Sequence, residues 1–179
     1  AMGCLDGANR ITDAGLAALA PYRVDNAVIM AAGMSSRFAP LSYEKPKALL
    51  KVKGEVLIER EIRQLQAAGI DDITVVVGYM KEKLFYLEDR FHVKIVINED
   101  YHRYNNPSTL MLVRDRLKNT FICSSDNYFE QNPFEPYVYQ AYYASLYSAG
   151  KTDEYCMVTN RKGRITGVQV GGSDAWYMF

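Results

Sequence analysis

The segment AVIMAAGMSSR, residues 27–37, carries the strongest structural signal in this sequence. Its first four residues form an apolar run typical of a buried strand, and a turn follows at Gly33. Backbone N–H groups in such a turn can face an anion, and the cations of Arg37 and Lys47 can close over it. The pattern indicates a triphosphate-binding loop. This loop differs from the two commonest phosphate-binding motifs, because neither a Walker A loop nor a Gly-x-Gly-x-x-Gly motif occurs in the sequence.

The composition narrows the class of protein. The chain has 179 residues, the length of one domain that buries a real core, and its 21 acidic residues balance 21 basic ones. This balance argues against a nucleic-acid partner, and no apolar run reaches the ~20 residues that cross a bilayer. The three cysteines are far apart and form no Cys-x-x-Cys pair, so we expect no structural zinc. With no secretory signal at the N-terminus, a cytoplasmic location is predicted.

Strand-like and helix-like segments alternate from residue 23 onward. Strands are predicted at residues 23–33, 72–78, 93–97 and 120–124, the first two of them buried, and helices at residues 57–68, 81–91 and from Asn106 onward. The apolar positions of the helix at residues 57–68 are Leu57, Ile58, Ile62 and Leu65, with polar residues between them. The alternation predicts a three-layer αβα, Rossmann-like fold around a mostly parallel sheet.

Three candidate site segments follow predicted strands, at residues 33–37, 78–79 and 125–126. Ligands in parallel sheets bind beyond the carboxyl ends of the strands, so these segments are expected to share one site. Asp126 is a turn-forming residue or a hard oxygen ligand for Mg²⁺, and its place opposite a triphosphate loop favours the metal. Tyr79 either stacks on a base or is an ordinary exposed loop tyrosine.

The remaining polar candidates lie at the start of the helix near residue 106. Asn105, Asn106 and Ser108 are typical N-cap residues, and the same helix terminus could accept a ribose or a phosphate.

Two terminal regions differ from this alternating pattern. Residues 11–22 predict a separate short helix, so we expect an N-terminal extension at residues 1–24 and a main domain at residues 25–179. Near the other end, residues 154–159 and 164–170 predict a hairpin in a small β-rich region. The apolar segment at residues 175–179 predicts a domain that continues further.

The region near the C-terminus is also rich in tyrosine, one of the 14 being Tyr155. The aromatic side chains of Tyr155 and Trp176 suit a hairpin core, which composition alone favours, or a cage for a quaternary ammonium.

Four segments resemble the nucleotidyltransferases, and among them the bacterial CTP:phosphocholine cytidylyltransferases. They read VIMAAGMSSRFAPLSYEKPKALL from residue 28, GYMKEKLFYL from residue 78, INEDYHRYNNPSTLMLV from residue 97 and CSSDNYF from residue 123. The resemblance spans residues 25–179 and implies a GT-A-type α/β fold. It also implies that residues 1–24 are the remnant of a linker or winged-helix region, and that a kinase-like domain could be fused in the full-length protein.

The same resemblance implies roles for individual residues. Arg37, Lys47 and Asp126 would be catalytic, with Asp126 holding Mg²⁺. Apart from the resemblance, we expect the aromatic side chains of Tyr128, Tyr155 and Trp176 to bind the acceptor. The predicted nucleotide-binding residues are Ala31, Ala32, Gly33, Met34, Ser35, Gly78, Tyr79, Asn105 and Ser108. A second metal-binding aspartate of the family would lie beyond residue 179.

These observations predict a Mg²⁺-dependent enzyme that transfers CMP from CTP to phosphocholine, giving CDP-choline and pyrophosphate. The expected partners are these two small molecules, with neither nucleic acid nor membrane insertion. Two alternatives keep the nucleotide loop. One is a sugar-1-phosphate nucleotidylyltransferase that uses UTP or dTTP, and the other is a nucleotide-binding module with an incomplete catalytic site.

Overall fold

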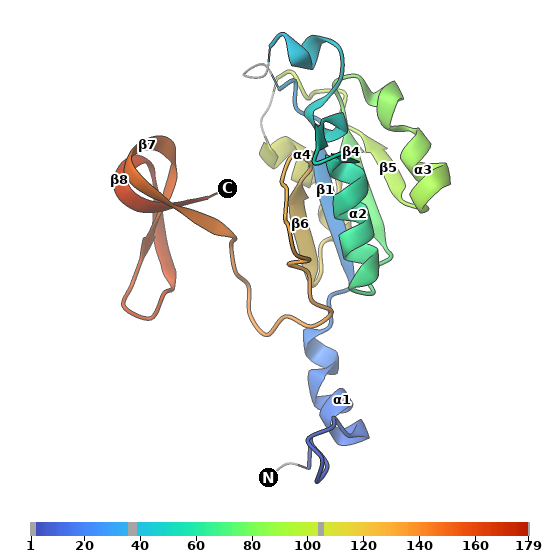
Figure 1. Cartoon of the computed structure of the whole chain (residues 1–179), viewed down its shortest axis with the longest axis vertical. Coiled ribbons are helices and arrows are strands. Elements are labelled where there is room, and N and C mark those ends of the chain that lie inside the picture. The colour runs from blue at the N-terminus through green and yellow to red at the C-terminus, as the bar shows by residue number, and fades with distance from the viewer. Residues whose placement is uncertain (1–2, 36–38, 104–105, 179) are drawn as a thin grey trace. The chain divides into compact units, whose positions relative to one another are not determined.

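The computed structural model describes residues 3–35, 39–103 and 106–178, and the chain divides into two compact units. The first unit, Ala1–Tyr139, contains an α/β domain preceded by a short helix, and the second, Gln140–Phe179, contains a long hairpin. Figure 1 labels their helices and strands.

A four-stranded parallel sheet forms the centre of the first unit. Its strands are β1 (Asn26–Ala31), β4 (Ile73–Val77), β5 (Lys94–Ile97) and β6 (Thr120–Ser124), in the order β5-β4-β1-β6. In the register of the sheet, Ile29 of β1 lies between Val75 of β4 and Cys123 of β6. The four strands and their parallel pairing confirm the fold predicted from the sequence.

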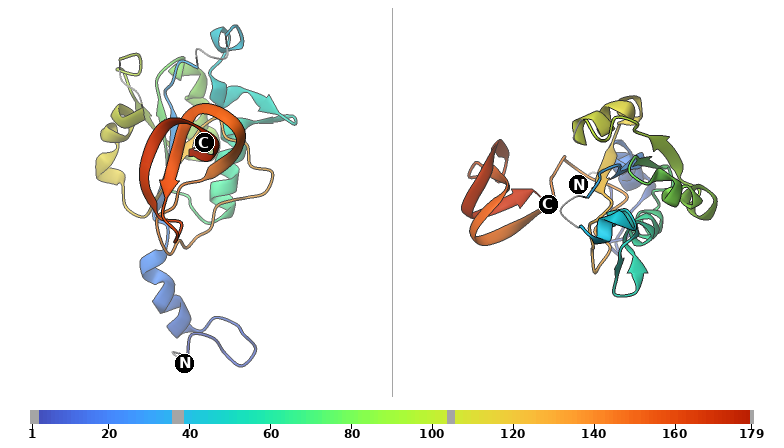
Figure 2. Two further views of the ribbon diagram at one scale, coloured as in Figure 1. Left: turned by 90° about the vertical axis from the view of Figure 1, so that its left-hand side faces the viewer. Right: turned by 90° about the horizontal axis from the view of Figure 1, so that it is seen from above.

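Helices cover both faces of this sheet. Successive side chains of a strand point to opposite faces, so the buried apolar residues of β1 and β4 need cover on each face. Ile29 and Val75 belong to a large core with residues of α2 (Leu57–Ala67) and α3 (Tyr86–Phe91). Val28 and Val76, one residue further along each strand, pack instead with Val113, Leu110 and Leu117 on the side of α4 (Asn106–Leu112). The resulting three layers, visible in Figure 2, confirm the αβα architecture.

The burial of α2 differs from the sequence prediction. Its apolar positions are buried as expected, but Glu59 and Glu61 are buried too, at 7% and 2% exposure. A sequence pattern assigns charged residues to the solvent face, and it could not show that two acids of this helix face the protein. The helix ends as predicted before Gly69, whose φ of 76° suits glycine.

Several short elements lie between the main ones. The sequence did not predict the small hairpin of β2 (Lys51–Val52) and β3 (Glu55–Val56), nor the 3₁₀ turns η3 (Leu41–Tyr43), η4 (Lys47–Leu49) and η6 (Arg114–Arg116). The helix predicted at residues 81–91 is divided into a 3₁₀ segment, η5 (Lys81–Leu84), and α3.

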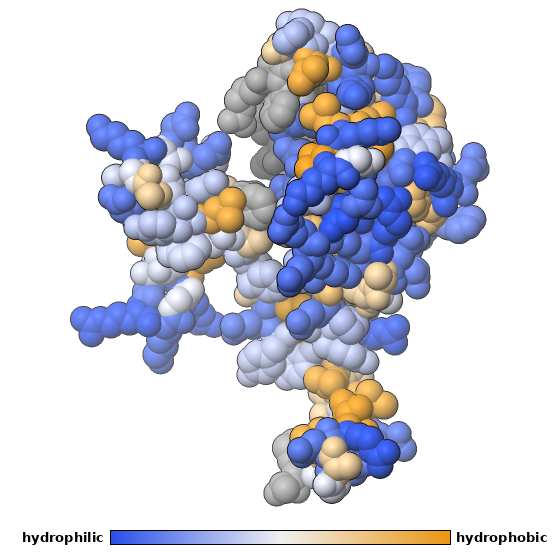
Figure 3. Space-filling model, in the orientation of Figure 1, coloured by the Kyte–Doolittle hydropathy of each residue, from blue (hydrophilic) through white to orange (hydrophobic). Residues whose placement is uncertain are grey.

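The N-terminal extension contains α1 (Asp13–Leu19) and a 3₁₀ turn, η1 (Ala20–Tyr22). The Thr12 side chain accepts a hydrogen bond from the Gly15 N–H and caps α1. Leu5, Ile11 and Leu16 are about half exposed, and Figure 3 shows hydrophobic atoms on the surface of this segment.

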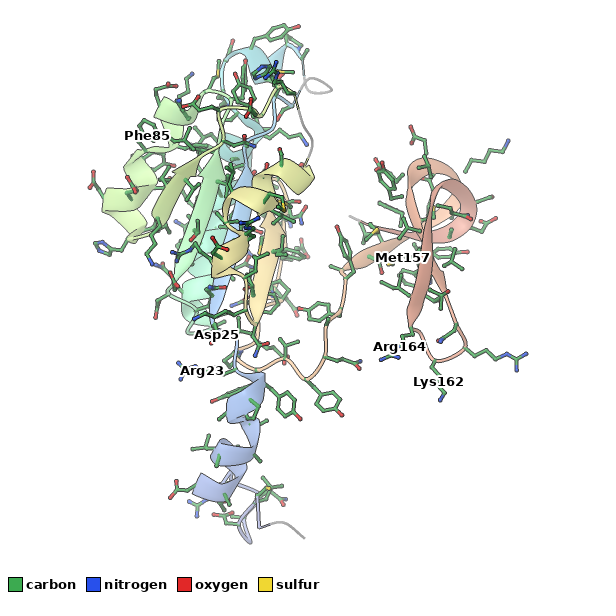
Figure 4. All side chains as sticks on the ribbon, turned by 180° about the vertical axis from the view of Figure 1, so that it is seen from behind. Arg23, Asp25, Phe85, Met157, Lys162 and Arg164 are labelled. Atoms are coloured by element: carbon green, nitrogen blue, oxygen red, sulfur yellow. The ribbon has the colours of Figure 1, made fainter. Side chains whose placement is uncertain are left out.

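The second unit is a long antiparallel hairpin of β7 (Ser145–Thr159) and β8 (Ile165–Met178). Asn160 N–H donates to the Arg164 carbonyl and closes the predicted turn, from which Lys162 and Arg164 project (Figure 4). Cys156 is the buried centre of this unit, at 1% exposure. No helix in the described parts of the chain is both long and apolar enough to cross a membrane.

Candidate active site

The candidate site lies beyond the carboxyl ends of β1 and β6. Strand order reverses at β1, because β4 and β5 extend the sheet on one side while β6 adds to the other. In open α/β sheets, ligands bind outside the strand ends at such a point. The Ser125 N–H donates to the Met30 carbonyl over 3.3 Å, so the segment that carries Asp126 is joined to the end of β1.

Lys47 and Asp126 meet at this edge. The Lys47 Nζ lies 2.5 Å from Oδ2 of Asp126, although 79 residues separate them in the sequence. Lys47 begins η4, where the Leu49 N–H donates to the Pro46 carbonyl and Ala48 is buried at 1% exposure. The side chains of Lys47 and Asp126 are 23% and 36% exposed, so a ligand can reach both.

The turn after β1 is open to solvent. Among the described residues, a Cβ added to Gly33 would meet no atom within 4 Å, and Met34 is 46% exposed. Ser35 adopts a left-handed φ of 56°, which bends the backbone away from the strand direction. Arg37, the predicted second cation, lies outside the described residues, and its role stays a prediction.

Gly78 supports this turn from β4. A Cβ at Gly78 would lie 2.8 Å from the Ala32 carbonyl oxygen and equally close to the Tyr101 ring. The Ala32 carbonyl also accepts a hydrogen bond from the Tyr79 N–H over 3.1 Å. Glycine is therefore needed here for close backbone approach.

The Tyr79 side chain spans from β4 to the segment before Lys47. Its hydroxyl donates to the Ser42 carbonyl over 3.1 Å, and its ring lies 6.4 Å from the ring of Tyr101. Tyr79 is half-buried, so it differs from the exposed loop tyrosine that was one expectation. Stacking on a base stays a prediction.

The start of α4 is fixed by a buried amide. Asn98 Nδ2 donates to the Thr109 hydroxyl over 3.1 Å, and both residues are nearly inaccessible to solvent. Ser108 is half-buried beside Thr109. Asn105 lies outside the described residues, so its predicted role is untested.

Tyr128, a predicted acceptor-binding residue, lies in a segment anchored on α2. The Arg60 guanidinium donates to the carbonyls of Phe129 and Glu130, and its centre lies 4.9 Å from the centroid of the Tyr128 ring. Lys53 also approaches this ring, at 5.7 Å. Sequence reasoning missed Arg60, because a charged residue on a helix gives no signal that it binds a loop 69 residues later.

The other two predicted acceptor-binding residues belong to the second unit. Tyr155 is 58% exposed and Trp176 is 53% exposed, so neither is a core residue. The Trp176 ring packs edge-on against Tyr147, with centroids 5.5 Å apart and planes at 65°. The hairpin-core interpretation favoured by composition is wrong for both residues.

Glu61 is an acid that sequence reasoning did not select. Among the described residues, neither of its carboxylate oxygens has a hydrogen-bond partner. Burial raises the pKa of Glu61 well above its usual value, and the charge of Asp126 raises it further. Burial therefore favours the neutral form of the Glu61 carboxyl.

The donor set at this edge fits Mg²⁺ bound together with phosphate. In the described part of the chain no three His, Cys, Asp or Glu residues cluster as a metal cage. Mg²⁺ does not need one, because it commonly takes one or two carboxylates and completes its shell with phosphates and water. Asp126 offers an accessible carboxylate of the kind that Mg²⁺ prefers.

Comparison with known proteins agrees with this geometry. Residues 27–168 match the family described as the MobA-like NTP transferase domain, and the chain belongs to this family. The choline-phosphate cytidylyltransferase of Streptococcus pneumoniae is 39% identical over 132 residues, which cover 74% of this chain and 58% of that protein. A 2-aminoethylphosphonate cytidylyltransferase from Lancefieldella rimae is 37% identical over 157 residues, covering 86% of this chain and 64% of that protein.

A solved structure shows the same likeness. The chain matches CTP:phosphocholine cytidylyltransferase from Streptococcus pneumoniae with a TM-score of 0.82 and 35% identity, over 87% of this chain and 68% of that one. The resemblance to bacterial CTP:phosphocholine cytidylyltransferases is thus confirmed. The chain spans about three fifths of the length of the two sequence relatives.

Proposed function

We propose that this protein is a Mg²⁺-dependent cytidylyltransferase that transfers CMP from CTP to phosphocholine. The observation that carries the proposal is the meeting of Lys47 and Asp126 at the strand ends of a nucleotidyltransferase fold. The similarity to choline-phosphate cytidylyltransferases supports the choice of nucleotide and acceptor. In this proposal residues 25–179 belong to the nucleotidyltransferase domain, and residues 1–24 are an extension.

The reaction requires positioning and charge neutralisation. A phosphate oxygen of phosphocholine attacks the α-phosphorus of CTP in line, the bond to the β-phosphate oxygen breaks, and pyrophosphate leaves. No side chain acts as a nucleophile. Bound at Asp126, Mg²⁺ would supply positive charge to the phosphate oxygens.

Side chains and backbone of this chain perform the remaining tasks. The turn at residues 32–35 offers its N–H groups to phosphate, and Gly33 leaves room for close approach. The ammonium of Lys47, together with Arg37, would neutralise the charge that develops on the leaving pyrophosphate. Gly78 and Tyr79 hold the turn in place, as their contacts with Ala32 indicate.

Acceptor recognition is assigned to aromatic side chains. The exposed rings of Tyr155 and Trp176 suit the quaternary ammonium of phosphocholine, which has no N–H to donate. Tyr128 is a weaker candidate, because its ring already lies near two cations.

A second acceptor is favoured by a specific observation. The 2-aminoethylphosphonate cytidylyltransferase matches a larger share of this chain than the choline-phosphate enzyme does, 86% against 74%. A primary ammonium would need hydrogen-bond acceptors as well as aromatic faces.

The test is a screen of pyrophosphate release with CTP, UTP or dTTP, each with phosphocholine, 2-aminoethylphosphonate or a sugar-1-phosphate. Release from CTP with phosphocholine supports the proposal. Release from CTP with 2-aminoethylphosphonate but not with phosphocholine would show that the acceptor is 2-aminoethylphosphonate. Release only from UTP or dTTP with the sugar phosphate contradicts it. CTP binding without release under any condition identifies a nucleotide-binding module.

A further inference from the structure

Lys47 and Asp126 have separate tasks in the proposed reaction, yet their side chains form an ion pair with each other in the structure. The Nζ of Lys47 lies 2.5 Å from Oδ2 of Asp126, so the two groups form a charge-assisted hydrogen bond. Lys47 is assigned to phosphate, and Asp126 is assigned to a metal ion. While this pair persists, an ammonium occupies the oxygen that the metal would use.

The local structure allows Lys47 to move without refolding its surroundings. Its backbone is held in η4, where the Leu50 N–H donates to the Lys47 carbonyl over 2.9 Å and Ala48 is buried. A lysine side chain carries a compact charge on a flexible four-carbon stem, so the ammonium can change partners by rotation alone. Asp126 lies in the segment that Ser125 joins to β1, which keeps the carboxylate in place.

We propose that the Lys47 ammonium is a removable substitute for the metal ion at Asp126. The phosphates of the incoming nucleotide draw Lys47 off the carboxylate, and a divalent cation then binds the vacated oxygen. This inference rests on the proposed function, because it takes Asp126 as the metal ligand.

The exchange has a thermodynamic consequence. A metal ion that arrives alone has to displace Lys47, and its apparent affinity is reduced by the free energy of the ion pair. A nucleotide that engages Lys47 removes this penalty. By linkage, the factor by which nucleotide raises metal affinity equals the factor by which metal raises nucleotide affinity. The pair therefore makes nucleotide and metal bind together.

A second ion pair provides a matched control. Lys81 Nζ lies 2.7 Å from Glu99, and the Lys81 side chain is 24% exposed, close to the 23% of Lys47. Glu99 is 73% exposed, and it follows β5 at the far side of the sheet, away from the point where the strand order reverses. Removing the charge of Lys81 changes the net charge of the protein by the same amount as removing that of Lys47, but it leaves the surroundings of Asp126 unchanged.

The test measures binding of Mn²⁺ alone, by electron paramagnetic resonance of the free ion, without nucleotide. We expect Lys47→Met to bind Mn²⁺ about tenfold more tightly than the parent protein. The metal ion no longer has to break a partly exposed ion pair, and it is no longer repelled by the ammonium; together these two effects change affinity by about this factor. Lys81→Met should leave the affinity within about twofold. Lys47→Gln, also neutral, repeats the measurement should the Met variant fold poorly.

A double variant separates this inference from the proposed function. Lys47→Met with Asp126→Asn should lose the tight Mn²⁺ binding. If Lys47→Met and Lys47→Gln bind Mn²⁺ no better than the parent while Asp126→Asn weakens binding, the substitution idea is wrong and Asp126 remains the metal ligand. If the double variant still binds tightly, the metal lies elsewhere, which overturns both this inference and the metal assignment; pyrophosphate release tests the reaction itself.

Discussion

The two ends of the parallel sheet carry ion pairs of different kinds. At the amino end, Asp72 accepts hydrogen bonds from Lys94 over 2.9 Å and from Arg116 over 2.8 Å. Asp72 precedes β4, Lys94 begins β5 and Arg116 precedes β6, so these contacts connect the amino ends of the three strands. At the carboxyl end, Lys47 comes from η4, outside the sheet, and reaches Asp126 beside an open glycine turn.

This difference separates structural charges from functional ones. Bonding to Lys94 lowers the pKa of Asp72, with Arg116 and neighbouring cations contributing, so the charged form suits the folded protein. The carboxyl end leaves its charges within reach of a ligand and provides backbone N–H groups beside them. We therefore expect loss of the charge of Asp72 to change stability, and loss of the charge of Lys47 or Asp126 to change activity.

The largest expected effect comes from Asp126→Ala. It should lower kcat/KM about 100-fold, or roughly 2.7 kcal/mol, because charge on the transferring phosphates loses its stabilisation. Asp72→Ala, which removes an equal charge at the other end, should keep kcat/KM within about threefold. Steady-state kinetics after a check of folding measures both, and equal losses in the two variants would break the comparison.

Next in size is Gly78→Ala. The new Cβ would lie 2.8 Å from the Ala32 carbonyl, so the turn has to shift, and we expect a loss of about 2 kcal/mol in the free energy of unfolding. The new Cβ of Gly33→Ala meets no atom of the described residues within 4 Å, so this variant should unfold like the parent while binding CTP more weakly. Urea unfolding and CTP titration measure the two variants. An unchanged CTP affinity for Gly33→Ala would remove the turn from the site.

A smaller effect is expected from the two buried acids of α2. Glu59 accepts hydrogen bonds from Tyr86 and Arg90 at 2.9 Å each, whereas Glu61 has no such partner among the described residues. Glu61→Met should raise the free energy of unfolding by about 1 kcal/mol, and Glu59→Met should lower it by about the same amount.

The pH dependence of Glu61→Met gives a sign test. The unfolded chain releases the Glu61 proton near its usual pKa of 4.5, but the folded protein retains it, since burial raises the pKa. The parent protein therefore loses stability as pH rises above this value, and the advantage of Glu61→Met widens. Urea unfolding at several pH values measures it. An advantage that shrinks with rising pH would mean that Glu61 is charged and paired in the folded protein.

The smallest effect concerns Asp72. Its lowered pKa stabilises the folded protein at neutral pH, and this contribution disappears as pH falls below the usual value of 3.8. Asp72→Asn should thus be less stable than the parent at pH 6 by under about 1 kcal/mol, because the carboxylate is 42% exposed, and equally stable near pH 2. Thermal unfolding across this pH range measures the difference in stability. A difference that does not change with pH would mean that packing, and not the charge of Asp72, causes it.

The sequence predicted the parallel sheet because its strands are continuous apolar runs, such as residues 73–77, that only burial explains. It also placed Asp126 beside the glycine turn, because strand ends of a parallel sheet share an edge, and it assigned Lys47 to the anion bound by that turn. It could not show that the two side chains touch, that Glu61 is buried, or that Arg60 anchors Phe129. Each of these depends on distances between residues far apart in the chain, which local patterns do not contain.

Transfer of label from CTP shows whether this protein catalyses nucleotidyl transfer. With CTP labelled at the α-phosphate, wild-type protein and Mg²⁺ should move the label onto phosphocholine, while γ-labelled CTP should yield labelled pyrophosphate. Asp126→Ala should slow both transfers together. Label from the γ-phosphate on the acceptor, or no α-label on phosphocholine or 2-aminoethylphosphonate, would contradict nucleotidyl transfer at this edge of the sheet.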